Sequence, residues 1–341
     1  TVADVAPLVG VNRAFVRQGL RVMAQRARPG LAALGDVARL DGPPAAYHLG
    51  FVLGPRINAG GRIGQADLGA RLLATDDPSE ARALALRLEA LNEERRTVEA
   101  EVRAAALAQA EARGFDAPLV WAAGEGWHPG VVGIVASRLK EAANRPAVVI
   151  GLDGGEGKGS GRSVGGIDLG HAVQRLAREG LLLKGGGHRM AAGLTVARDR
   201  LEEAMAALSD LLARQGAGAG GPADLRLDGV LMPGAATVEL VERIEAAGPF
   251  GAGAPAPRHV FPDCRIVFAR VLGEAHLKLR ADDGLGATLD VIGFGAAEGP
   301  LGAALLNHGG GRFHLAGRVE INHWGGRQAV QLRLEDAARA G

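Results

Sequence analysis

The sequence predicts a multidomain α/β protein that ends in a small β-rich domain. Three observations support this fold class: a length of 341 residues, one long helical pattern before residue 114, and a strand–helix alternation followed by a run of short strands. A chain of this length can bury more than one hydrophobic core, so several domains are expected.

The composition is that of a globular protein without a membrane span. Apolar residues make up 47% of the chain, and no apolar run is long enough to cross a bilayer. Cys264 is the single cysteine, which excludes an internal disulfide framework and fits a reducing compartment, so we expect a cytoplasmic protein. The chain has 39 Lys and Arg against 38 Asp and Glu, so its net charge is close to zero. Any nucleic-acid site must therefore be a local group of cations.

A long helix is the clearest predicted element. Asp77, Pro78 and Glu80 provide an N-cap, a first-turn proline and a capping-box acid, and Gly114 provides the stop signal. The helix between them would be about 50 Å long. Arg95 stands in its apolar seam, as part of a functional surface or of a buried ion pair. The Gly-rich segment 54–64 is predicted to be a loop.

From Pro118 onward, strand and helix patterns alternate as in a β-α-β unit. His128 lies at a strand-to-helix corner where helix amides can receive an anion, although a lone turn histidine is more often a cap. Residues 157–163, GKGSGRS, combine glycines with a hydroxyl and a guanidinium, which fits a phosphate-binding turn or a plain hairpin. The GGGH of residues 185–188 favours ligand approach to the backbone over a simple turn.

The C-terminal third alternates short β-like runs with turns and has one helical stretch near residues 301–306. This pattern predicts a small barrel of the OB type, with a β-sandwich as the alternative. The predicted organisation is a helical segment at 1–76, the long helix at 77–113, an α/β domain at 114–214, a linker at 215–224 and the barrel at 225–338.

Several motifs occur in the order seen in RecJ exonucleases of the DHH phosphoesterase superfamily: GPRINAGGRIG, LNEERR, EGWHPGVVGIVASRLKE, GSGRS, GGGHRMAAG and GPFGAGAPAP. The chain resembles that family over nearly its whole length. Its opening, TVADVAPL, is similar to the segment that follows the last metal-binding aspartate motif of a DHH domain, so we expect a fragment that begins past the catalytic core. The resemblance implies the helical end of a DHH domain, a long connecting helix, an α/β DHH-associated domain and an OB-type barrel.

The resemblance also implies roles for individual residues. The 5′ phosphate and its nucleotide would be bound by Ser160, Arg162, Gly185, Gly186, Gly187, His188 and His128. The strand backbone would be followed by Arg56, Arg62, Asn92, Arg95 and Arg96, the last of which stands where the family usually has glutamine. The barrel would hold outgoing strand through Lys278, Arg280, Arg318, Trp324 and Arg327.

The resemblance implies Mn²⁺ or Mg²⁺ in the complete enzyme, with metal ligands upstream of Thr1 and none held by this chain. The expected function is the substrate-binding part of a 5′-to-3′ single-stranded-DNA exonuclease in DNA repair and recombination, a part that binds without cutting. The alternatives are a stand-alone single-strand-binding module and a small-oligonucleotide phosphodiesterase. We expect a monomer whose partner is single-stranded DNA, with no membrane partner; a single-strand-binding protein and a helicase are further candidates.

Overall fold

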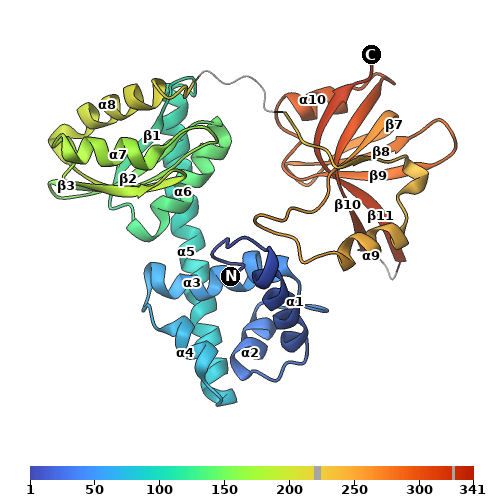
Figure 1. The fold of residues 1–341 in the computed structure, drawn as a ribbon, viewed down its shortest axis with the longest axis horizontal. Helices are drawn as coiled ribbons and strands as arrows, with labels where there is room; N and C mark the ends of the chain where they lie inside the picture. The colour runs from blue at the N-terminus through green and yellow to red at the C-terminus, as the bar shows by residue number, and fades with distance from the viewer. Residues whose placement is uncertain (219–223, 325–326) are drawn as a thin grey trace. The chain divides into compact units, whose positions relative to one another are not determined.

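The computed structural model describes residues 1–218, 224–324 and 327–341, without the side chains of Trp324 and Arg327. The chain forms two compact units (Figure 1). The α/β unit comprises residues 23–43 and 47–223, and the barrel unit comprises residues 1–22, 44–46 and 224–341. Residues 1–22 thus group with the barrel and not with the other helices of the predicted 1–76 segment, and the domain limits proposed from the sequence remain a prediction.

The long helix is confirmed: α5 spans Pro78–Arg113, 36 residues. Asp77 caps it, because the Ser79 N–H donates to the Asp77 carboxylate at 2.8 Å. Glu80 does not complete the predicted capping box. Its carboxylate accepts from the Thr75 hydroxyl at 2.6 Å and pairs with Arg71 at 3.1 Å, and these contacts lower its pKa. Neither α5 nor any other helix of the described residues is long and apolar enough to cross a membrane.

The N-terminal half of α5 packs in a leucine-rich core against three shorter helices, α2 (Pro29–Val37), α3 (Gly54–Ile63) and α4 (Leu68–Ala74). A π-helix, His48–Leu53, leads into α3. The loop predicted for residues 54–64 is therefore wrong. Pro55 suits the first turn of a helix, and Gly60 allows close packing, since a Cβ there would lie 3.3 Å from the Leu88 side chain.

The C-terminal half of α5 packs on a five-stranded sheet of order β1-β2-β3-β5-β4. The elements are β1 (Val120–Glu125), α6 (Pro129–Ala143), β2 (Ala147–Asp153), β3 (Glu156–Arg162), α7 (Leu169–Arg178), β4 (Lys184–His188), β5 (Ala191–Ala197), a 3-10 turn (Arg198–Arg200) and α8 (Leu201–Ala213). α5 and α6 cover one face of the sheet, and the core on the other face is completed by α7 and α8 (Figure 1).

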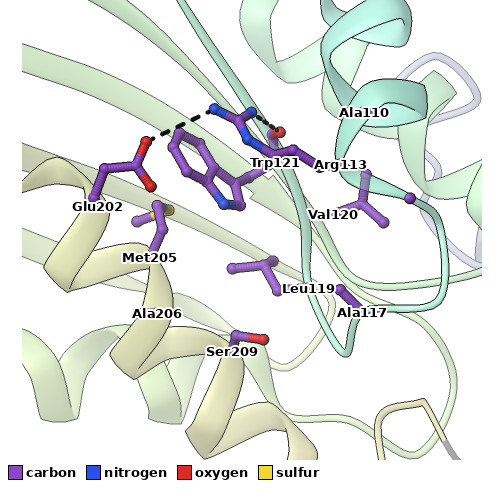
Figure 2. A pocket seen from close by; sticks show the side chains of 11 residues that line it. Ala110, Arg113, Ala117, Leu119, Val120, Trp121, Glu202, Met205, Ala206 and Ser209 are labelled. Carbon is purple, nitrogen blue, oxygen red and sulfur yellow. Dashed lines mark hydrogen bonds and ion pairs between the residues drawn. The ribbon is translucent and has the colours of Figure 1, made fainter.

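The free edge of β1 is sealed by side chains of α5. Gln109 exchanges two hydrogen bonds with the Ala123 backbone, at 2.9 and 3.1 Å, and Arg113 donates to the Trp121 carbonyl at 2.9 Å. Figure 2 shows Arg113 between Trp121 and Glu202, at the rim of a pocket of about 200 Å³ whose floor is apolar. These contacts satisfy backbone groups that an edge strand would otherwise offer to another strand.

The barrel unit confirms the OB-type prediction. Strands β7, β8, β9, β11 and β10 follow one another in the sheet, and β10 pairs with β7 to close it. The elements are α1 (Gly10–Ala24), β6 (Gly229–Val230), a 3-10 turn (Pro233–Ala235), α9 (Val238–Ala246), β7 (His259–Leu272), β8 (His276–Asp282), β9 (Thr288–Gly293), α10 (Pro300–Leu306), β10 (Arg312–Trp324) and β11 (Arg327–Arg339). The segment before α1 joins this unit through the Leu8 N–H, which donates to the Ala252 carbonyl at 2.7 Å.

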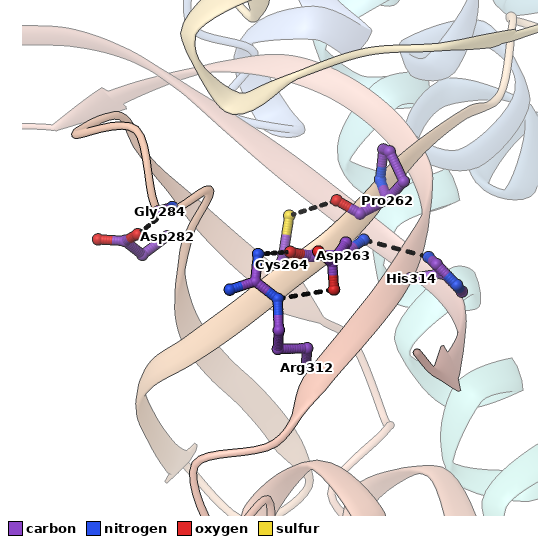
Figure 3. A network of polar contacts seen from close by, with 7 residues as sticks. All are labelled: Pro262, Asp263, Cys264, Asp282, Gly284, Arg312 and His314. Atoms are coloured by element: carbon purple, nitrogen blue, oxygen red, sulfur yellow. Dashed lines mark hydrogen bonds and ion pairs between the residues drawn. The ribbon is translucent and has the colours of Figure 1, made fainter. Parts of the chain in front are cut away.

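A polar network holds the irregular pairing of β7 with β10 (Figure 3). Asp263 has a φ of 51°, its N–H donates to His314 Nδ1 at 3.1 Å, and its carboxylate pairs with Arg312 at 2.6 Å. Cys264 beside it is fully buried, and burial raises the pKa of its thiol to about 11. The single cysteine is thus a buried, weakly acidic side chain that packs like a small apolar residue.

Candidate nucleic-acid interface

The alternation of β3 explains the GKGSGRS motif. Ser160 pairs with Val149 and Arg162 with Ala147, so both side chains lie on the sheet face that carries α6. The intervening glycines face the other core. A Cβ on Gly159 would lie 2.9 Å from the side chains of Ile150 and Leu194. One face of the strand therefore needs glycine for packing, and the other presents the hydroxyl and the guanidinium.

The same register places the GGGH motif beside these two side chains. Ser160 pairs with Gly193 and Gly193 with Gly186, while Arg162 pairs with Ala191 and Ala191 with His188. A Cβ on Gly186 would meet nothing within 4 Å. The sheet surface over Gly186 and Gly193 thus carries no side chains, and Ser160 lies beside it. We call this surface the floor. His188 lies two strands from Arg162, a separation of about 10 Å.

Arg162 is held by its neighbours on β3 and by a glycine of α6. Its guanidinium donates to the Ser160 hydroxyl at 2.9 Å and to the Gly161 carbonyl at 2.8 Å. A Cβ on Gly133 would lie 3.0 Å from Arg162 Nη2 and 3.1 Å from Ser160 Oγ, so only glycine lets α6 approach this pair without displacement. Burial lowers the pKa of Arg162, and the nearby charge of Arg62 lowers it further.

Arg62 joins Arg162 from a distant part of the sequence. Its guanidinium donates to the Gly130 carbonyl, in the first turn of α6, at 2.9 Å. Burial lowers its pKa first, the charge of Arg95 lowers it further, and the charge of Glu99 acts in the opposite direction. We call Arg62, Arg95 and Arg162, with Glu99, the guanidinium cluster. The cluster thus has three guanidinium groups and one carboxylate, which pairs with Arg95.

The other residues predicted to follow the strand backbone lie in different settings. Arg56 forms a two-point ion pair with Glu89 and donates to the Val52 carbonyl at 2.6 Å. Asn92 and Arg95 are only 3% and 8% exposed, and Arg95 pairs with Glu99 and donates to Asn92 Oδ1 at 3.0 Å. Arg96 is exposed. Of the five, only Arg62 and Arg95 belong to the guanidinium cluster, and Arg95 is an ion-paired interior residue.

His128 and His188 each use one ring nitrogen locally. His128 caps α6, since its Nδ1 accepts from the Gly130 N–H at 3.0 Å. His188 Nδ1 accepts from the Met190 N–H at 3.3 Å. Both rings are exposed, so the phosphate or nucleotide contacts expected of them stay predictions that involve the second nitrogen.

On the barrel, acidic side chains pair with some of the cations that were predicted to bind the outgoing strand. Arg280 pairs with Asp290 at 2.8 Å, Arg318 pairs with Glu335 at 2.9 Å, and Lys278 has no acidic partner among the described residues. The side chains of Trp324 and Arg327, also predicted to bind strand, lie outside the described residues.

The strand pairing reveals cations that sequence reasoning missed. Arg270 pairs with Lys278 across β7 and β8, and the row continues through Ile292 to Arg333 on β11. Arg333 lies 5.3 Å over the ring of Phe294, which is 54% exposed. We call Arg270, Lys278, Arg333 and Phe294 the barrel face. A row of cations beside an exposed ring is the usual surface for single-stranded nucleic acid, and strand alternation was the signal that could have found it.

The two domains seen in the structure match two family models. The DHHA1 domain matches residues 116–214, and the RecJ OB domain matches residues 227–336. The single-stranded-DNA-specific exonuclease RecJ of Dickeya dadantii is 39% identical over 98% of this chain, and that of Escherichia coli is 37% identical over 98%. The chain belongs to the RecJ family.

Solved RecJ structures share the fold. RecJ from Thermus thermophilus in complex with Mn²⁺ matches all of this chain with a TM-score of 0.82 and 32% identity, and its complex with Mg²⁺ matches with a TM-score of 0.81. The chain covers 48% of the Mn²⁺-bound RecJ chain and 59% of each of the two curated RecJ relatives named above.

Those RecJ structures contain divalent metal ions, and such an ion needs several ligand side chains close together. In the part of the chain that the structure describes, no group of three or more His, Cys, Asp or Glu side chains could hold a metal ion. The described residues therefore do not fit a RecJ metal centre, and what they offer chemically is anion binding.

Proposed function

We propose that this chain forms the strand-binding part of a single-stranded-DNA exonuclease that degrades DNA from the 5′ end in repair and recombination. The guanidinium cluster is the observation that carries the proposal. Glu99 pairs with Arg95 and its charge also acts on Arg62, whereas Arg62 and Arg162 have no ion pair of their own among the described residues. A terminal phosphate monoester carries a charge of about −1.5 to −2 at neutral pH, whereas an internal diester carries one charge.

The surroundings of the cluster suit a terminal nucleotide. The Ser160 hydroxyl and the Arg162 fork can both bond phosphate oxygens. The bare floor over Gly186 and Gly193 lets a nucleotide approach the backbone closely. The barrel face would hold strand farther from the 5′ end through charge and stacking, which carry little base information.

The test compares 5′-phosphorylated with 5′-hydroxyl single strands of the same sequence. Arg162→Ala should weaken binding of the phosphorylated strand about 10- to 100-fold and of the hydroxyl strand only slightly, because it removes charge-assisted hydrogen bonds to the terminal phosphate. Fluorescence anisotropy measures both dissociation constants. Arg138→Ala is the control, since Arg138 is an exposed arginine of α6 paired with Glu141. Equal losses for the two strands would refute the proposed phosphate site.

We further infer that the chain binds strands without cutting them, since it spans only about 59% of relatives that are named as exonucleases. Incubation of the purified chain with 5′-phosphorylated single strands and Mn²⁺ or Mg²⁺ should leave the strands at full length on a denaturing gel. Progressive shortening from the 5′ end would contradict the inference that the chain does not cut. It would not contradict the proposed 5′-phosphate site.

A further inference from the structure

A pocket of about 290 Å³ opens at the carboxyl ends of the parallel strands β1 and β2. We call it the Trp127 pocket. In α/β sheets, ligands commonly bind outside the carboxyl ends of parallel strands. It is lined by Trp127, His128, Pro129, Leu152, Asp153, Glu156 and Lys158, with glycines 126 and 151. Its size is near the lower end for a small-molecule site.

Two glycines seat the tryptophan that gives the pocket its name. A Cβ on Gly124 would overlap the indole ring of Trp127, and a Cβ on Gly151 would overlap its backbone carbonyl. Each strand thus has a glycine close to its carboxyl end, and the indole lies over Gly124 of β1. The ring packs against the core beneath α6 and is half-buried, so its position is well defined.

The pocket and the guanidinium cluster lie on the same face of the sheet. Lys158 lies on the same face of β3 as Ser160 and Arg162, about 13 Å from Arg162 at the rise of an extended strand. The start of α6 borders both sites: His128 and Pro129 line the pocket, and Gly130 accepts from Arg62. A strand anchored at the cluster can therefore reach the pocket with a nearby nucleotide.

The chemistry of the walls suits a nucleobase and disfavours a phosphate. Trp127, Pro129 and Leu152 form apolar walls, while the side chains of Asp153, Glu156 and Lys158 have no hydrogen-bond or ion-pair partner among the described residues. Two carboxylates outweigh the one ammonium, so a second phosphate would be repelled. Carboxylates accept from exocyclic amino groups, which adenine, cytosine and guanine carry and thymine lacks.

We propose that the Trp127 pocket binds one unpaired nucleobase of the strand whose 5′ phosphate lies at the guanidinium cluster, with preference for a base that carries an exocyclic amino group. This inference rests on the proposed function. Stacking on the indole provides affinity, and the carboxylates of Asp153 and Glu156 select the amino base. The preference is local to one nucleotide near the 5′ end.

The experiment uses 5′-phosphorylated thymine homopolymers in which one of the first few nucleotides is abasic or adenine. At one position, the abasic site should weaken binding on the order of tenfold, and adenine should strengthen it. Trp127→Leu should remove the abasic effect at that position. The double substitution Asp153→Asn and Glu156→Gln, which changes two exposed side chains, should remove only the adenine preference.

Trp121→Leu is the matched control, because Trp121 lies on the same strand as Gly124 but lines the pocket at the β1 edge. It should leave the positional profile intact. The inference would be overturned if Trp127→Leu left the effect of the abasic site on affinity unchanged at every position. It would also be overturned if no position of the strand affected the affinity of the wild-type chain. If the wild-type chain still binds 5′-phosphorylated strands more tightly than 5′-hydroxyl strands, only the base-binding inference fails and the proposed function stands. If that preference is also absent, the inference and the proposed function both fail.

Discussion

Two glycines of the α/β unit, one within the GGGH motif and one on α7, have opposite packing environments. Gly186 faces open space above the floor of the sheet, where a Cβ meets nothing within 4 Å. Gly170 lies under the same motif, where a Cβ would be 2.7 Å from the His188 carbonyl oxygen. Gly186 leaves the sheet surface bare, where we propose that ligand binds, and Gly170 lets α7 pack closely under the strand that carries His188.

Gly186→Ala should therefore weaken binding of a 5′-phosphorylated strand several-fold, because a methyl group occupies the floor, while the free energy of unfolding stays the same or rises slightly. Gly170→Ala should lower the free energy of unfolding by about 1–3 kcal/mol through overpacking. Urea denaturation and strand-binding titrations measure the two quantities. A loss of stability without a loss of affinity in Gly186→Ala would exclude the floor as a ligand surface.

Among the elements, α5 combines a structural and an electrostatic task. It carries Glu89, which pairs with Arg56, and Glu99, which pairs with the interior Arg95. Only Glu99 also raises the pKa of Arg62 through its charge. One of the two glutamates therefore sets the charge of the guanidinium cluster, and the other stabilises the packing of α3 on α5.

Glu99→Gln should lower the free energy of unfolding on the order of 3 kcal/mol, because a nearly buried arginine loses its counter-charge. A saturating 5′-phosphorylated strand should raise the melting temperature of this variant more than that of the wild type, since the phosphate replaces the missing charge. Glu89→Gln is the control, in which the ligand-induced shift should equal that of the wild type. Identical shifts in both variants would contradict a cluster tuned by Glu99.

At the scale of the whole molecule, a nearly neutral chain carries two local cationic sites. The net charge is only +1, yet in the part of the chain that the structure describes the guanidinium cluster and the barrel face each gather more cations than acidic partners. Binding should accordingly depend on strand length, because short strands engage the 5′ end alone and longer strands also engage the barrel face.

The double substitution Lys278→Ala and Arg333→Ala should abolish the gain in affinity on lengthening the strand and leave the 5′-phosphate preference unchanged. The slope of log affinity against log salt concentration should fall by about 0.7 for each phosphate that the variant no longer neutralises. Arg280→Ala, which removes a cation already paired with Asp290, should change the slope little. A length dependence that survives the double substitution would place the second strand site elsewhere.

The predictable features are those set by neighbouring residues. Asp77 and Gly114 mark the ends of α5 because capping is local, and the alternation of β3 follows from the pleat of any strand. The Gly-rich helix α3 was missed, since Gly60 serves a close contact with Leu88 and Leu68, which lie elsewhere in the chain. The OB-type barrel could be predicted from the number and length of its strand patterns.

By itself, the sequence determined most element types, with α3 as an exception, and also the order of the motifs and the resemblance to RecJ, because these depend on residues close together along the chain. The tertiary structure decided which cations are free. It brought Arg62 close to Arg162, paired Arg56 with Glu89 of α5, and placed Arg270 and Arg333 in the same row as Lys278 on the barrel. Charge pairing depends on distance in space, which sequence separation does not reveal.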